Sequence, residues 1–154
     1  MRGDLYRPET KDRVLRRLAG LGPESRRQWG RMTPHQAICH LADAFDWAAG
    51  RRPSDAMAKP PLPPFLMRLI ALRLPFKWPK GVRTMPETDQ MKGGTAPMEF
   101  ESDRERLKVL IDEFARWETD AERPSHPIFK TMGRKDWGRW GYRHMDHHLR
   151  QFGC

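Results

Sequence analysis

The segment GRKDWGRWGYRHMDHHLRQF, residues 133–152, has the pattern of an amphipathic helix with an unusual buried face. Because a helix advances by about 100° per residue, its aromatic rings and two of its imidazoles fall on one stripe. That stripe consists of Trp137, Trp140, Gly141, His144, His148 and Phe152. Its apolar ends predict that it faces a core, where imidazoles are accepted only when a partner satisfies them.

The two imidazoles of this stripe have the spacing of a metal-binding pair. His144 and His148 lie one helical turn apart, which is how a single helix supplies two ligands to one ion. His147 lies only about 60° from His144, so the spacing alone leaves a pair formed by residues 144 and 147 open. A site of the catalytic zinc type needs a third imidazole from another part of the chain.

A second predicted helix supplies the candidate for that third ligand. Thr33 and Pro34 mark its start as a hydroxyl N-cap followed by proline, and Gly50 suits the position after its end. Its buried face is formed by Ala37, Leu41, Ala44, Phe45 and Ala48. His40 lies on the same arc, and the small alanines leave space beside its ring. We therefore predict His40, His144 and His148 as metal ligands.

Other side chains are candidates for the surroundings of this site. A metal-bound imidazole generally hydrogen-bonds through its second ring nitrogen. By position alone, Asp43, Gln36 and Gln151 could accept such a bond, with ordinary solvation as the alternative for each. His147 is either a ligand or a neighbour, and the loop that carries His126 is predicted to border the pocket.

Two further helices complete an all-α prediction for a single domain over residues 1–154. One covers residues 9–19 after a loose or lightly docked arm, residues 1–8. The other runs from Ser102, where Ser102 and Glu105 predict a capping box, to about Asp120. Four such helices with one long connection indicate a four-helix bundle.

The connection, residues 51–101, is rich in proline and glycine and predicts a long irregular excursion between the second and third main helices. Only FLMRLIALRL, residues 65–74, indicates a helix, which we expect to be a packed insert or a subunit contact rather than a membrane-surface segment. The excursion is expected to serve as a lid or pocket wall. Trp29, in the connector that precedes the second helix, is expected to plug the core from the side.

Composition narrows the class of protein. The formal charge is +9, but the basic residues are spread along the chain, which favours a solvated basic surface over a nucleic-acid partner. No apolar run is long enough for a membrane span, and the N-terminal MRGDLYRPET lacks the apolar core of a signal peptide. Cys39 and Cys154 fit no disulfide framework, so a cytoplasmic protein is expected.

These motifs together resemble one family. HMDHHLRQF resembles the final-helix signature of the DinB-like metalloprotein superfamily, and WGRMTPHQAICHLADAF resembles its second helix. SHPIFKTMGRKDWGRWGYRH and WPKGVRTMPETDQMKGGTAPMEFESDRERL are similar to the His-Pro loop and middle segment of one uncharacterised branch, so the likeness covers most of the chain. One departure is Lys130, at a position where related sequences often have glycine.

The resemblance implies an up-down-down-up bundle, often dimeric, in which His40, His144 and His148 bind a divalent ion such as zinc or nickel and His147 is a neighbour. Characterised relatives include thiol-dependent S-transferases and a thiol-dependent isomerase, but kinship of fold does not assign a reaction.

From this we expect a metal-dependent enzyme of thiol-transferase or hydrolase type that acts on a small molecule. A low-molecular-weight thiol is a candidate cofactor, with Arg143 or Lys130 as candidates to attract it, and a homodimer is a candidate assembly. The alternative is a non-catalytic binding protein, with a structural metal or an anion-binding basic surface.

Overall fold

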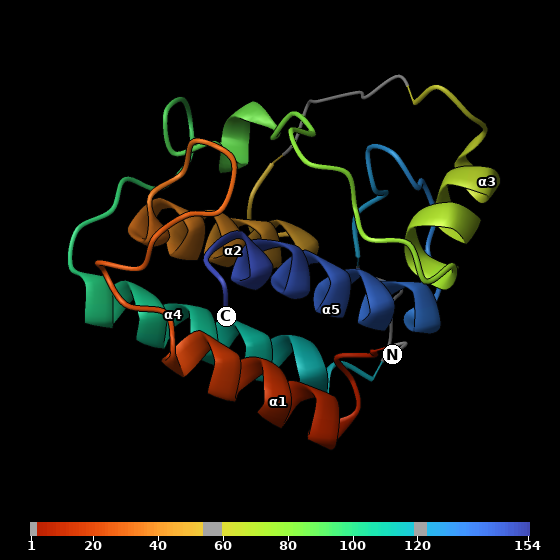
Figure 1. The fold of residues 1–154 in the computed structure, drawn as a ribbon. Coiled ribbons are helices and arrows are strands. Elements are labelled where there is room, and N and C mark those ends of the chain that lie inside the picture. Colours follow the sequence, from red (N-terminus) through yellow and green to blue (C-terminus); the bar gives the residue numbers. More distant parts are fainter. Residues whose placement is uncertain (1–2, 54–59, 119–122) are drawn as a thin grey trace.

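The computed structural model describes residues 3–53, 60–118 and 123–154 (Figure 1). Within these residues the structure is helical, and the only strand-like pairing is an isolated bridge between His126 and Lys130. The expected all-α class is therefore confirmed. The elements are α1 (Pro8–Ala19), α2 (Pro34–Ala48), α3 (Pro64–Arg68), the π-helical η1 (Leu69–Arg73), the 3-10 turn η2 (Pro86–Thr88), α4 (Phe100–Arg116) and α5 (Arg134–Gln151).

The four long helices, α1, α2, α4 and α5, surround one hydrophobic core. α2 packs on both α4 and α5, and α1 also packs on both of these helices. Each helix buries an apolar stripe in the shared core, with Leu18, Phe45, Ile111 and Leu149 as examples from the four. Because each such side chain contributes about 1.5–3 kcal/mol when fully buried, this core holds α2 and α5 at the separation that the site requires.

The ends of α2 follow the local signals in its sequence. The Thr33 hydroxyl accepts a hydrogen bond from the Gln36 amide, and the Gln36 side chain accepts one from the Thr33 amide. This reciprocal cap satisfies two amides that the first turn of a helix leaves without partners. Gly50, just beyond the C-cap, has a φ of 71°. The predicted start and end of this helix are confirmed, and the Gln36 side chain is engaged in the cap.

The predicted start of α4 is wrong. The helix begins at Phe100, and its N-cap is Glu99, whose carboxylate accepts hydrogen bonds from the amides of Glu101 and Ser102. Those bonds lower the pKa of Glu99 below its usual value. A carboxylate interacts more favourably than a hydroxyl with the positive end of the helix dipole, so the cap lies three residues upstream of Ser102. The helix ends at Arg116, short of the predicted Asp120, which lies outside the described residues.

The described part of the N-terminal arm, residues 3–7, is docked rather than loose. Leu5 is fully buried, and its amide donates to the Gly138 carbonyl of α5 over 2.9 Å. The arm lies so close to α5 that a Cβ on Gly138 would fall 2.1 Å from an Asp4 carboxylate oxygen. The sequence contained two signs of this docking, Gly138 on α5 and the apolar Leu5 within the arm.

The helix predicted over residues 65–74 is present as α3 and η1. η1 packs on α5, Leu72 is buried, and Arg143 of α5 donates to the Leu74 and Phe76 carbonyls. Arg73 pairs with Asp136 over 3.2 Å. η1 is thus packed on α5, whereas α3 buries no residue, so a subunit contact through α3 stays a prediction. In the described part of the chain, no helix combines the length and the apolar character needed to cross a membrane.

Candidate metal centre

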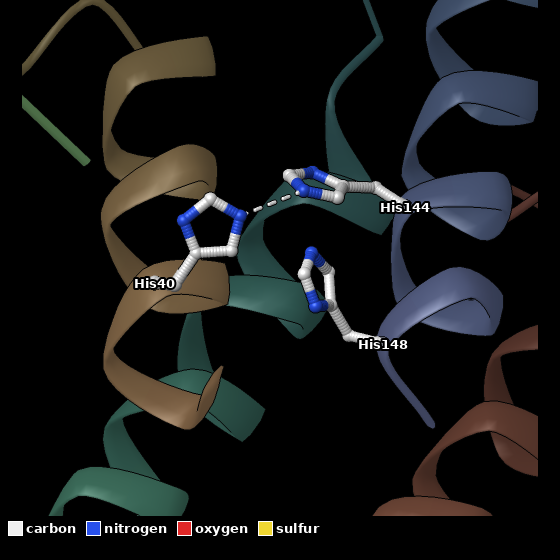
Figure 2. Close-up of side chains that lie close together, drawn as sticks. All are labelled: His40, His144 and His148. Atoms are coloured by element: carbon white, nitrogen blue, oxygen red, sulfur yellow. Dashed lines mark hydrogen bonds between the residues drawn. The ribbon is translucent and has the colours of Figure 1, made fainter. Parts of the chain in front are cut away.

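Three histidines from two helices converge inside the molecule (Figure 2). His40 projects from α2, and His144 and His148 project from successive turns of α5. One ring nitrogen of each lies within 4.8 Å of the others, and the Nε2 atoms of His40 and His144 are 3.0 Å apart. Ligand nitrogens on a tetrahedral zinc lie about 3.3 Å apart at ordinary bond lengths. This three-histidine cluster could therefore hold one metal ion.

Outer hydrogen bonds orient two of the three rings. Nδ1 of His40 lies 2.8 Å from the Thr88 carbonyl, and Nδ1 of His148 lies 2.9 Å from Oε1 of Gln151. Gln151 donates its own Nε2 hydrogen to the Trp29 carbonyl, which identifies Oε1 as the acceptor. Each Nδ1 therefore donates, and each Nε2 keeps its lone pair for a metal. Nδ1 of His144 is buried and has no hydrogen-bond partner among the described residues.

The surroundings keep all three rings neutral. Burial lowers the pKa of His40. Burial and then the neighbouring His40 imidazole lower the pKa values of His144 and His148 well below the usual range. Neutral imidazole is the form that binds a metal. His40 is buried, whereas His144 and His148 are partly exposed.

Asp43, a candidate by position for the outer hydrogen bond to His40, bonds to other groups instead. Its fully buried carboxylate hydrogen-bonds to Arg52, Gln90 and Thr95, the last through both amide and hydroxyl. These bonds fasten the end of the excursion to α2. Thr88, in η2, belongs to the same segment, so Asp43 helps to hold the carbonyl that meets His40. Burial lowers the pKa of His40, and the charge of Asp43 also acts on His40 directly and raises that pKa, though by less. A backbone carbonyl carries no side-chain signature, and for that reason the sequence did not reveal Thr88.

His147 and His126 lie outside the three-histidine cluster. The His147 ring is 6.0 Å from the Trp29 ring and 6.1 Å from the Trp78 ring. The His126 ring stacks on Phe129 at 4.4 Å, and Trp140 lies between it and His144. Nδ1 of His126 accepts from two loop amides, those of Ile128 and Phe129. His126 is therefore a buried residue that packs on Phe129 and Trp140 and does not contact the three-histidine cluster directly.

Replacing His126 by asparagine should make the free energy of unfolding depend less steeply on pH in the acid range. Burial, with a smaller contribution from Lys130, lowers the pKa of His126 to about 3. In the unfolded chain the His126 side chain has a pKa of about 6.5, so on acidification it takes up a proton there before it does in the folded protein. The contribution of neutral His126 to stability is therefore fully present above about pH 6.5 and declines as the pH falls below it. The slope should be about 1.4 kcal/mol per pH unit.

Urea unfolding of the parent and His126→Asn between about pH 4 and pH 7 measures this difference. The asparagine oxygen can accept the same two amide hydrogens without titrating. Other titrating groups are common to both proteins and cancel in the comparison. Parallel profiles would show that His126 is not the group responsible.

Three residues that the sequence did not single out for this site lie next to it, and we call them the rim residues. Trp78 contacts His144, Trp29 contacts the neighbouring His147, and Lys80 contacts Trp29. Trp78 donates through Nε1 to the Ala71 carbonyl, and its ring lies 6.0 Å from the His144 ring. Lys80 Nζ lies 4.6 Å from the centre of the Trp29 ring. The only signal for this rim was the run Trp78-Pro79-Lys80 within the excursion.

Of the two cations predicted to attract a thiol, Arg143 donates to the Leu74 and Phe76 carbonyls and is engaged there. The backbone of Lys130 pairs with that of His126, and the role of its side chain stays a prediction. Two surface hollows also lie away from the cluster, one beside Phe45 and Trp117 and the other beside Phe65. Neither hollow is lined by a residue of the three-histidine cluster.

Comparison with known proteins gave no match: no family model, no curated protein and no solved structure is significantly similar to this chain. The resemblance to the DinB-like superfamily thus stays a prediction from motifs. The site is identified by its own geometry, as a cluster of His40, His144 and His148 in an all-helical chain that could bind a metal ion.

Proposed function

We propose that this protein binds a divalent cation, zinc or nickel, at the three-histidine cluster and is a metal-dependent enzyme of thiol-transferase or hydrolase type. The observation that carries the proposal is the convergence of three neutral imidazoles, two of them on partly exposed residues. Three protein ligands with an open position are typical of catalytic rather than structural zinc. A cation held there supplies Lewis-acid chemistry and lowers the pKa of a bound water or thiol.

We also propose that the chain has the up-down-down-up bundle of the DinB-like superfamily. The directions of the four long helices support this. The colours in Figure 1, which follow the chain from N- to C-terminus, show that α1 and α5 run in one direction and that α2 and α4 run in the other. A backbone angle adds further support. Lys130 has a φ of 56°, in the left-handed region that favours glycine, and related sequences often have glycine there.

The rim residues supply the binding chemistry for a small anionic substrate or thiol. The exposed ammonium group of Lys80 attracts negative charge, and the faces of Trp29 and Trp78 offer apolar contact beside the histidines. Thr88 and Gln151 hold two of the ligand rings in one orientation. Trp140 excludes water from the inner side of the cluster, where its ring lies 5.2 Å from that of His144.

The basic surface does not favour a nucleic-acid partner. Several arginines are paired within the molecule, among them Arg17 with Asp146 and Arg52 with Asp43, each at 2.9 Å. Arg51 and Arg106 both pair with Asp46. Charge engaged in this way is distributed around the molecule and is less available to a phosphate backbone.

A paired assay tests the proposed function. The parent and a His144→Ala/His148→Ala variant, purified without chelator or tag-derived metal and then loaded with zinc or nickel, are screened for thiol-dependent transfer and for hydrolysis. We expect turnover by the loaded parent and background rates for the variant. Bound metal without turnover in either screen would favour a non-catalytic binding protein. Absence of bound metal would show that the histidines serve a polar network.

A further inference from the structure

A second group of ligand-type side chains lies between α2 and α4, away from the three-histidine cluster. It consists of His35 and Cys39, one turn apart on α2, and Asp103 in the first turn of α4. One ligand atom from each lies within 4.8 Å of the others. Asp103 Oδ2 is 2.7 Å from His35 Nε2 and 3.6 Å from Cys39 Sγ.

The two clusters use different faces of the same helix. Cys39 and His40 are consecutive, so their side chains leave α2 about 100° apart. Cys39 contacts Asp103 of α4, whereas His40 contacts His144 of α5. Because α2 packs on both α4 and α5, the face that carries Cys39 meets α4 and the face that carries His40 meets α5. The second cluster therefore shares no ligand with the first.

We propose that His35, Cys39 and Asp103 form a second metal site, which takes a zinc-type cation. An imidazole nitrogen, a thiolate and a carboxylate are the three kinds of protein ligand that zinc accepts. The sulfur favours zinc or cobalt over magnesium or calcium, which prefer oxygen. The His35 and Asp103 side chains are 22% and 16% exposed, so solvent can reach the site and complete the coordination.

Binding at this site exchanges a proton for the metal. The cation forms a bond to Sγ of Cys39, the S–H bond breaks, and the proton passes to solvent. Burial, followed by the nearby Asp103 carboxylate, raises the pKa of Cys39 to about 12, so the thiol is protonated in the metal-free protein. Asp103 is held in place by the Met98 amide, which donates to Oδ2 over 3.1 Å.

The competing explanation is a hydrogen-bonded group that fastens α4 to α2. The His35–Asp103 bond fits that explanation well, and the His35 ring also packs edge-on against Phe100 at 5.3 Å. Cys39 fits it less well, because a thiol is a weak donor and adds little to a carboxylate that already has two better ones. The two explanations differ in whether the sulfur ever binds a metal.

Cobalt(II) titration of the metal-free chain distinguishes them. Sulfur bound to cobalt gives an intense thiolate-to-metal absorption in the near ultraviolet, and the three-histidine cluster contains no sulfur. We expect the saturated band to correspond to one sulfur-bound cobalt per chain, with two equivalents of cobalt bound in all. Cys39→Ser should remove the band and one equivalent, while Cys154→Ser and His40→Ala should both retain the band.

Asp103→Asn provides a second variant, which keeps the size of the side chain and should weaken the band without abolishing the fold, as checked by circular dichroism. No band in the parent would overturn the proposal, as would a band that survives Cys39→Ser. Because His40→Ala disables only the first cluster, failure of the second site and failure of the proposed function give different results.

Discussion

Replacing His40 by alanine should abolish the stabilisation that zinc confers through the three-histidine cluster. α2 contributes only this ligand to the cluster, so its loss leaves two imidazoles on α5 and breaks the link between the two helices. A ligand that binds only the folded state stabilises it by about 2.7 kcal/mol at one hundred times its Kd. We expect a gain of that order in the parent and none in the variant.

Chemical unfolding with and without zinc measures this effect, in a Cys39→Ser background so that the second cluster does not contribute. The comparison is of zinc-dependent changes, so the intrinsic cost of removing a buried imidazole cancels. His147→Ala is the matched control, because it removes a histidine of α5 that lies outside the cluster. An equal zinc response in His40→Ala would mean that the ion binds elsewhere.

Asp43→Ala should destabilise the protein by about 3–5 kcal/mol, the usual cost of removing one partner from a buried ionic network. The carboxylate is fully buried and accepts hydrogen bonds from Arg52, Gln90 and Thr95. Its removal leaves these donors unpaired and releases the segment that presents the Thr88 carbonyl to His40. Zinc affinity should fall together with stability.

Urea unfolding of the zinc-free proteins gives the change in free energy, and hydrogen exchange of the amides at residues 85–95 reports the release of the segment. Asp46→Ala is the control, since Asp46 lies on the same helix but its pairs with Arg51 and Arg106 are partly exposed. Exposed pairs contribute about 0–1 kcal/mol. A loss for Asp43→Ala no larger than that of the control would contradict the assigned role.

Local signals were sufficient for the elements that carry the ligands. The cap at Thr33, the glycine at position 50 and the apolar periodicity placed α2 within a residue or two. The same kind of signal failed for α4, where the Ser102 motif competed with a charged cap at Glu99. Capping depends on which of two nearby side chains reaches the free amides, and a spacing rule cannot decide between them.

The sequence alone was enough to predict an all-helical chain and to place His40, His144 and His148 on the inward stripes of their helices, because helical periodicity is a local property of neighbouring residues. In the structure His40 is buried and the other two are partly exposed. The contacts that complete the site depend on the packed chain. Thr88 meets His40 across 48 positions, and Trp78 reaches His144 from the excursion. Cys39 meets Asp103 because α2 packs on α4. No periodicity encodes such contacts, because they arise only when the core brings distant backbone and side-chain groups together.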